Sequence, residues 1–197
     1  MVEATDLFDS WAKMGKDEGM ERGHSKSVNS MLESVFARIE GKFSAIDVGC
    51  GNGWVVRKLA AHPDCTSASG VDGAVTMIQK ARDIDPGGNY HLAMLPQWIP
   101  DSKVDLIHSM EFMYYLDKPA EMLQSFALNW LNSKGLIVIG IDHYLENEDS
   151  HSWPSDLDVK MKMMSQEEWR TAMVNAGFVD IEVWTAGPTL CLCGRIE

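Results

Sequence analysis

The chain has 197 residues, and its hydrophobic content of 45% is sufficient for one sizeable core, which favours a single domain over two. Its formal net charge of -12 would repel phosphate backbones and anionic lipids, so nucleic acid and membranes are not expected partners. No segment approaches the roughly 20 apolar residues of a membrane span, and the first residues are acidic where a secretory signal is basic, so we expect a cytoplasmic protein.

The first 40 residues have helical patterns of two kinds. Residues 6–24 mix apolar and charged side chains with several glycines, which predicts a short helix followed by a mobile segment. From residue 25 to residue 39, apolar positions recur at intervals of three and four, which predicts an amphipathic helix. Gly41 ends this helix.

Beyond Gly41, short apolar runs alternate with helical periods. The predicted strands are 43–48, 68–71, 90–93, 104–109 and 136–141, and the predicted helices are 54–61, 75–81 and 119–131. This alternation implies βαβ units, a mostly parallel sheet and helices on both faces, which is an α/β fold. A helix over 166–176 then precedes strands 179–185 and 190–196, whose short connecting turn makes them antiparallel neighbours.

A glycine-rich turn follows the first buried strand and opens a helix. Gly49, Gly51 and Gly53 would bring bare backbone close to a ligand at the carboxyl end of the sheet, which is typical of a nucleotide-type site. Two residues distinguish the possible ligands. Trp54 stands where a dinucleotide fingerprint needs glycine or alanine, and Asp47 would repel a pyrophosphate but complement the ammonium and sulfonium of S-adenosylmethionine.

Asp72 lies at the end of the next predicted strand and is followed by a helix. A carboxylate at this place can accept hydrogen bonds from both hydroxyls of a ribose. Asp47, the glycine turn and Asp72 therefore form one constellation on successive strands, which favours an adenosyl cofactor over a purely structural turn.

At these motifs the sequence resembles the class I methyltransferase family, over nearly its whole length. Residues 45–53 look like the first motif of that family, 70–78 like its second acidic loop, 104–109 like its fourth strand, and 130–136 like the turn into its fifth strand. The resemblance implies a Rossmann-like three-layer sandwich with a seven-stranded, mostly parallel sheet in the order 3-2-1-4-5-7-6, strand 7 being antiparallel.

The sequence departs from the family pattern after the third strand. The family commonly has an acidic residue there that binds adenine, whereas residues 93–96 keep the Leu-Pro pair without a carboxylate. Adenine recognition by Met94 and Leu95 would then use backbone groups and apolar contact. The connection to the fourth strand is also short, so the helix usual at this place is expected to be missing.

The resemblance further implies two parts within one domain of residues 1–197. Residues 1–40 would form an N-terminal helical lid, and 41–197 the catalytic core. The implied cofactor is S-adenosylmethionine, bound by Trp11, Asp47, Gly49, Cys50, Gly51, Asn52, Gly53, Asp72, Gly73, Met77, Met94, Leu95, Ser109 and Met110.

Candidate catalytic residues for the methyl acceptor follow the fourth and fifth strands. Methyl transfer is an in-line displacement at a carbon activated by the sulfonium, so the protein chiefly orients the nucleophile and excludes water. Glu111, Tyr114 and His143 are the candidate catalytic residues, although tyrosine packing and a merely solvated histidine are the simpler interpretations. Neither the cysteines nor the loop histidines have metal-site spacing, so no metal is expected.

The sequence thus predicts an enzyme that methylates a small molecule, as a monomer or homodimer. Two alternatives stay open: an NAD-dependent oxidoreductase, which Trp54 disfavours, and a catalytically silent module that binds S-adenosylmethionine.

Overall fold

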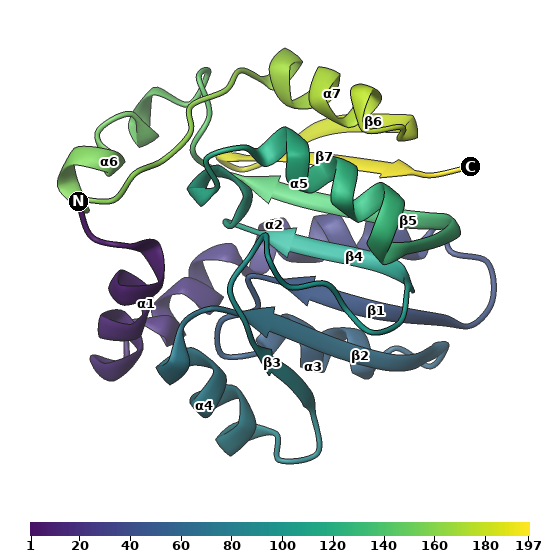
Figure 1. Cartoon of the computed structure of the whole chain (residues 1–197), viewed down its shortest axis with the longest axis horizontal. Helices are drawn as coiled ribbons and strands as arrows, with labels where there is room; N and C mark the ends of the chain where they lie inside the picture. The colour runs from purple at the N-terminus through teal and green to yellow at the C-terminus, as the bar shows by residue number, and fades with distance from the viewer.

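The computed structural model describes all 197 residues and contains one seven-stranded sheet, with strands in the order β3-β2-β1-β4-β5-β7-β6 (Figure 1). The strands are β1 (Phe43–Val48), β2 (Cys65–Asp72), β3 (Asn89–Leu92), β4 (Val104–Met110), β5 (Leu131–Ile141), β6 (Val179–Ala186) and β7 (Thr189–Arg195). Neighbouring strands from β3 through β5 pair in parallel, and β7 is antiparallel to both β5 and β6. The predicted fold class, strand order and closing hairpin are confirmed.

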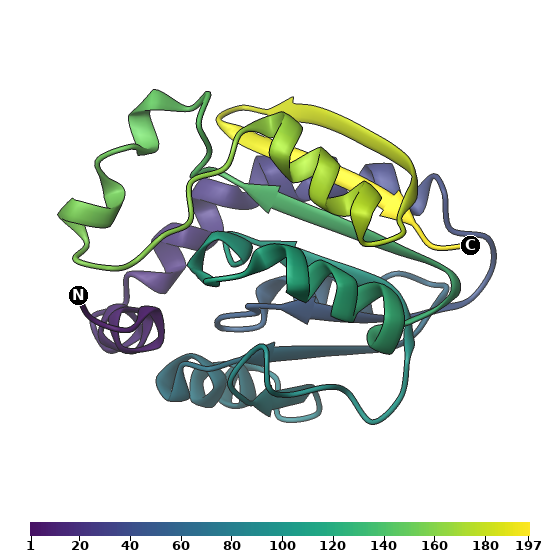
Figure 2. The ribbon, with the colours of Figure 1, turned by 45° about the horizontal axis from the view of Figure 1, so that its top comes forward.

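Helices cover both faces of this sheet, as Figures 1 and 2 show. The helices are α1 (Ala4–Lys13), α2 (Asp17–Phe36), α3 (Trp54–Ala60), α4 (Val75–Ile84), α5 (Pro119–Ser125), α6 (Trp153–Asp156) and α7 (Gln166–Asn175), with single turns at Met113–Tyr115, Phe126–Trp130 and Glu148–Ser150. None of them combines the length and the apolar character that crossing a membrane requires. No helix lies between β3 and β4, as the short connection predicts.

Two apolar layers hold the helices on the sheet. On one face, the buried Trp130 and Trp169 pack with residues of α5 and α7 against the central strands. On the other face, Met31 of α2 and Leu59 of α3 pack against β1 and β5. Because both faces of the central strands are buried, their sequences are continuous apolar runs rather than alternating patterns.

The second helix begins earlier than its sequence pattern predicts. Residues 17–24, which were expected to be mobile, form the first two turns of α2. Asp17 and Glu18 place negative charge at the helix N-terminus, which favours the helix. Asp17 is also buried and accepts hydrogen bonds from two other elements. This docking outweighs the helix-propensity cost of about 1 kcal/mol for each glycine of the segment.

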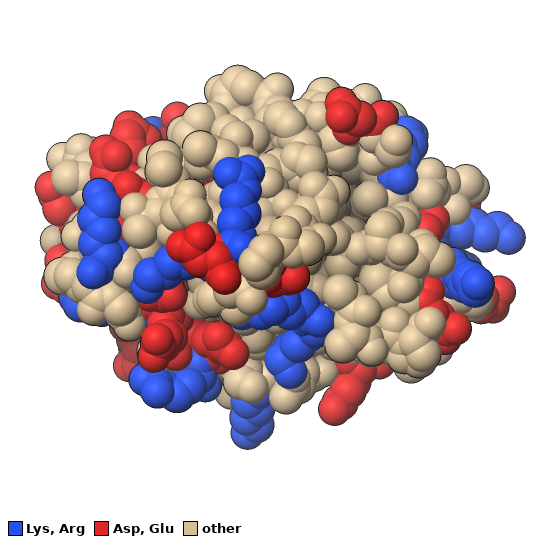
Figure 3. Space-filling view, turned by 90° about the horizontal axis from the view of Figure 1, so that it is seen from below, with Lys and Arg blue, Asp and Glu red and all other residues tan.

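The carboxyl ends of the parallel strands meet at one edge of the sheet, beside α1 and the start of α2 (Figures 1 and 2). This edge carries the glycine turn after β1, Asp72 at the end of β2 and the acidic residues after β4 and β5. Ligands of open α/β sheets bind at this edge. On the face seen from below, basic and acidic side chains are interspersed and form no continuous basic patch (Figure 3).

Candidate functional site

A cavity opens at the carboxyl edge of the sheet, beneath α1 and the first turns of α2. Its acidic lining residues are Glu3, Asp17, Asp47, Asp72 and Glu111, and its other polar or apolar walls include Thr5, Phe8, Met20, His24, Met77, Met94, Leu95, Met110, Phe112 and Tyr115. No lysine or arginine lines it. The cavity therefore favours a ligand that carries positive charge, and it lacks groups that would neutralise a pyrophosphate.

The glycine turn forms the floor of the cavity. The backbone N–H groups of Gly49 and Cys50 donate to the carbonyl of Val71 at 2.9 and 3.1 Å, which fixes the turn on β2. Gly49 has φ of 76°, and a Cβ there would lie 2.7 Å from the side chain of Phe112. Gly51 has φ of 52°, but a Cβ there would meet only the Met77 sulfur, at 3.8 Å. A side chain at Gly51 would instead occupy ligand space, since Gly51 lines the cavity.

Asp72 closes the end of β2 toward the cavity. Its Oδ2 accepts from the backbone N–H of Gly51 at 2.9 Å, and its Oδ1 accepts from that of Ala74 at 2.8 Å. Burial raises the pKa of Asp72, although these hydrogen bonds oppose the shift. Each carboxylate oxygen can accept a further hydrogen bond, so Asp72 has capacity for two ligand hydroxyls.

Asp47 contacts a buried histidine of β4 that was not predicted from the sequence as a site residue. His108 of β4 is fully buried, and its Nδ1 lies 2.7 Å from Asp47 Oδ1. This contact fixes the orientation of the Asp47 carboxylate. A histidine between the apolar residues of β4 and Ser109 was the one signal of this pair.

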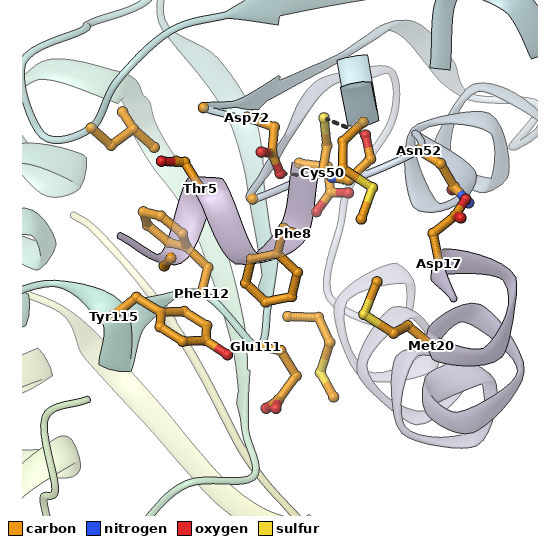
Figure 4. Close-up of a pocket in the computed structure, with 18 of the residues that line it drawn as sticks. Thr5, Phe8, Asp17, Met20, Cys50, Asn52, Asp72, Glu111, Phe112 and Tyr115 are labelled. Atoms are coloured by element: carbon orange, nitrogen blue, oxygen red, sulfur yellow. Dashed lines mark hydrogen bonds between the residues drawn. The ribbon is translucent and has the colours of Figure 1, made fainter. Parts of the chain in front are cut away.

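Asp17 joins three elements at the rim of the cavity. Its Oδ2 accepts from the Asn52 side chain at 3.0 Å, and its Oδ1 accepts from Lys80 Nζ at 2.7 Å. Burial opposes the charge on Asp17, but the bonds from Lys80 and Asn52 outweigh it and lower the pKa of the carboxyl. The start of α2 is thereby tied to the glycine turn and to α4, and Figure 4 shows Asp17 beside Asn52.

A second group of polar side chains lies at the far end of the cavity. Glu111 follows β4 with φ of 56°, a strained conformation for a residue with a side chain. Its Oε1 accepts from the Asp142 backbone N–H at 2.6 Å, and its Oε2 accepts from the Tyr114 hydroxyl at 2.5 Å. Burial, and next the charge of Asp142, raise the pKa of Glu111 to about 8.

His24 completes this group from α2. Its Nε2 lies 3.6 Å from Asp142 Oδ2, and His24, Glu111 and Asp142 each offer an atom within 4.8 Å of the others. Burial disfavours charge on His24, yet the contact with Asp142 and the charge of Glu111 outweigh it and raise the pKa of the ring. In Figure 4, Asp72 and Glu111 lie on opposite sides of Phe8, which comes down from α1.

Most of the residues predicted to hold a cofactor line this cavity. They are Asp47, Gly49, Cys50, Gly51, Asn52, Asp72, Gly73, Met77, Met94, Leu95 and Met110. Gly53, Ser109 and Trp11 do not. The Cα of Gly53 faces the ring of Tyr90, and Ser109 is buried with its hydroxyl donating to Val48. Trp11 packs edge-on against Phe8, which takes the cavity position.

The predicted catalytic residues divide in the same way. Glu111 lines the cavity, and Tyr114 stands behind it as a hydrogen-bond donor that is itself fully buried. His143 does not reach the cavity. Its ring is buried, its Nδ1 lies 3.0 Å from the Ser150 carbonyl, and it stacks on Trp153. The neighbouring Asp142 contributes instead to the polar group.

Comparison with known proteins gives matches of one kind. A family model described as a methyltransferase domain matches residues 17–183. Trans-aconitate 2-methyltransferase from Rhizobium rhizogenes is 31% identical over 107 residues, which are 54% of this chain and 41% of that protein. The chain spans about half the length of the curated relatives it matches, from 41% to 56%.

Two solved structures extend these matches to the whole chain. A putative methyltransferase from Haloferax volcanii, solved with the Trm112 methyltransferase activator, is 27% identical with a TM-score of 0.81, over 96% of this chain and 97% of its own. A possible histamine N-methyltransferase from Thermotoga maritima has a TM-score of 0.73 over 98% and 99% of the two chains. At 17% identity, the latter is evidence of the fold alone.

Proposed function

The chain belongs to the methyltransferase domain family, and we propose that it transfers a methyl group from S-adenosylmethionine to a small-molecule acceptor. The observation that carries this proposal is the acidic cavity built on the glycine turn, without any lysine or arginine in its lining. S-adenosylmethionine has a sulfonium and an ammonium, which such a lining complements. The NAD-dependent alternative would place a pyrophosphate among carboxylates and against Trp54, which also lines the cavity.

The chemical groups of the cavity match the parts of this cofactor. Asp72 has acceptor capacity for the ribose hydroxyls, and the Met94 side chain packs over Gly73, where a Cβ would lie 3.0 Å from its sulfur. Met94 and Leu95 offer apolar surface for adenine. Asp47, fixed by His108, supplies negative charge at the carboxyl end of β1.

The bound cofactor would supply a methyl carbon that its sulfonium already activates. The protein's residues would then orient the acceptor and exclude water. Phe8 of α1 packs edge-on against Tyr115 at 5.4 Å between ring centres, and Met20 of α2 lines the same side. Asp9 of α1 accepts from the Thr76 backbone N–H at 2.6 Å, which ties α1 to α4. We propose that residues 1–40 act as a lid held by these contacts over the core of residues 41–197.

A protein partner is a second element of this proposal. The Haloferax volcanii neighbour was solved with a methyltransferase activator, and its likeness extends over 96% of this chain. We propose that this chain also binds a Trm112 activator, in place of the expected monomer or homodimer. Co-expression followed by size-exclusion chromatography should give a stable complex, and separate elution of the two proteins would contradict it.

Methyl transfer from cofactor labelled in its methyl group tests the proposed function. We expect label to pass to small acceptors of a broad panel and the demethylated cofactor to accumulate in equal amount. If the cofactor binds but label never leaves it, the silent binding module replaces the enzyme as the better interpretation.

A further inference from the structure

We propose that the methyl acceptor is a basic amine, which Asp142 and Glu111 bind as a cation and from which His24 removes a proton. This inference rests on the methyl-transfer function proposed above. It concerns the end of the cavity opposite Asp72, where His24 of α2 and Glu111 after β4 line the cavity and Asp142 after β5 lies within 4.8 Å of both.

The charge of this end of the cavity excludes an anionic acceptor. Two carboxyl groups, of Glu111 and Asp142, face one imidazole, and no lysine or arginine lines the cavity to pair with an anion. A carboxylate ligand such as trans-aconitate would therefore meet like charge, and like-charge contacts cost several kcal/mol. A protonated amine would supply the positive charge that the group lacks.

A buried acceptor atom without a donor also favours a ligand that carries N–H groups and positive charge. Asp142 Oδ1 is buried and has no hydrogen-bond partner, and the Asp142 side chain is only 8% exposed. A buried carboxylate oxygen is strongly destabilising unless a donor reaches it. Its other oxygen, Oδ2, lies 3.6 Å from His24 Nε2, too far for a direct hydrogen bond. The N–H groups of an ammonium can satisfy both this carboxylate and an unprotonated Nε2.

Glu111 can contribute a further negative charge when a cation binds. Both of its oxygens already accept hydrogen bonds, from the Asp142 backbone and from Tyr114. Its raised pKa, caused by burial and by Asp142, leaves it largely protonated near neutral pH. An arriving cation lowers that pKa, so Glu111 ionises and releases a proton as the amine binds. Tyr115, the other titratable group on the Met113–Tyr115 turn, lines the cavity beside it.

The proton of the amine passes to His24. His24 Nε2 takes a proton from the ammonium, which leaves a lone pair on the nitrogen and a positive charge on the imidazole ring. As the nitrogen–carbon bond forms, the sulfur–carbon bond of the cofactor breaks and its electron pair stays on sulfur. Besides binding the amine, Asp142 stabilises the imidazolium, because its Oδ2 lies 3.6 Å from His24 Nε2.

A divalent metal is the competing occupant of this group. The mutual separations below 4.8 Å are compatible with a metal site. The aromatic side chains Phe8, Phe112 and Tyr115, however, line the cavity. Aromatic faces attract organic cations, so this lining favours an amine.

Calorimetry on protein saturated with demethylated cofactor tests the proposal, with 2-phenylethylamine as the amine probe and 3-phenylpropionate and trans-aconitate as anionic probes. We expect the amine to bind at least about tenfold more tightly than either acid. Titrations at pH 7.5 in buffers of different ionisation enthalpy should show proton release with the amine. Tighter binding of an acid, or no binding of the amine by cofactor-loaded protein, overturns the proposal. Failure of the cofactor itself to bind would instead overturn the methyltransferase function.

Two further measurements separate the roles. His24→Gln should lower kcat for the amine by about 100-fold or more and remove the acid limb of the pH profile, with unchanged cofactor affinity. The matched control His151→Gln lies in an exposed loop outside the cavity and should leave both unchanged. Unchanged kcat in His24→Gln contradicts its role. Titration with Mn²⁺ or Zn²⁺ alone should show no metal binding at this site. Metal binding that is lost in His24→Gln, or methyl transfer that a chelator inhibits, would favour the metal.

Discussion

The two ends of the cavity are built in different ways. The Asp72 end is made of backbone turns from two short continuous segments, residues 47–53 and 72–74, with one carboxylate at each strand end. The Glu111 end is made of side chains that three distant elements bring together. Local sequence therefore defines the first end and tertiary packing the second, so that substitutions at the two ends should affect different steps.

The largest effect is expected at the Asp72 end. Asp72→Ala removes the acceptor that we propose for the ribose hydroxyls and should weaken cofactor binding by about 1–3 kcal/mol without unfolding the protein. Calorimetry with S-adenosylmethionine measures the loss, and thermal unfolding checks the fold. Unchanged affinity would remove Asp72 from the site and end the contrast between the two regions.

At the Glu111 end, the corresponding change should act on turnover and on the pH dependence of stability. Glu111→Gln should lower turnover more than cofactor affinity. Its folded-state pKa of about 8 exceeds the ordinary 4.5, so the folded protein binds more protons between these values. The wild-type free energy of unfolding should therefore fall more steeply than that of the variant as pH rises from about 4.5 to 8.

Denaturant unfolding of both proteins at pH 5 and at pH 8.5 measures this difference. Parallel pH profiles for wild type and Glu111→Gln would show that burial of Glu111 does not raise its pKa. Equal turnover in the two proteins would remove Glu111 from the acceptor site.

The glycine turn allows a test in which only the ligand space changes. Gly51→Ala directs a Cβ into the cavity, and we expect about tenfold weaker cofactor binding, or about 1.4 kcal/mol. Gly187→Ala is the matched control, because Gly187 has a similar φ of 67° and open space in the β6–β7 turn. We expect the two variants to lose similar amounts of stability and only Gly51→Ala to lose cofactor affinity. Equal cofactor affinity in the two variants would contradict the placement of the glycine turn at the floor of the cofactor site.

The smallest effect is expected where the lid meets the core. Asp17→Asn weakens the link of α2 to Lys80 and should reduce stability by about 1 kcal/mol, with a smaller effect on turnover. Glu121→Gln breaks an exposed pair with Lys118 and should change stability by less than about 0.5 kcal/mol. Denaturant midpoints compare the two variants, and an equal loss would mean that Asp17 does not tie α2 to the core.

The same contrast explains what could be predicted from the sequence. The strands and the glycine turn follow from local apolar runs and turn residues, whereas the strand order and the placement of Met94 and Leu95 follow from the resemblance to the family. The hydrogen bond between Asp17 and Asn52 joins residues far apart in the chain, which no local pattern reports. The start of α2 was consequently predicted too late.

The orientation of single side chains could not be predicted from the sequence either. His143 was predicted at the acceptor site, but its ring packs against Ser150 and Trp153, because local sequence does not define the course of the loop after β5. Phe8 and Trp11 share one face of α1, and packing alone decides that Phe8 lines the site. His24 was included with the lid, although its approach to Asp142 depends on where α2 docks.

Calorimetric titration of the purified chain with S-adenosylmethionine, its demethylated product and NAD tests the central claim most directly. An acidic cavity without lysine or arginine should bind the first two and not NAD. Binding to NAD alone, or to none of the three, would contradict the assignment of this cavity to a methyl donor.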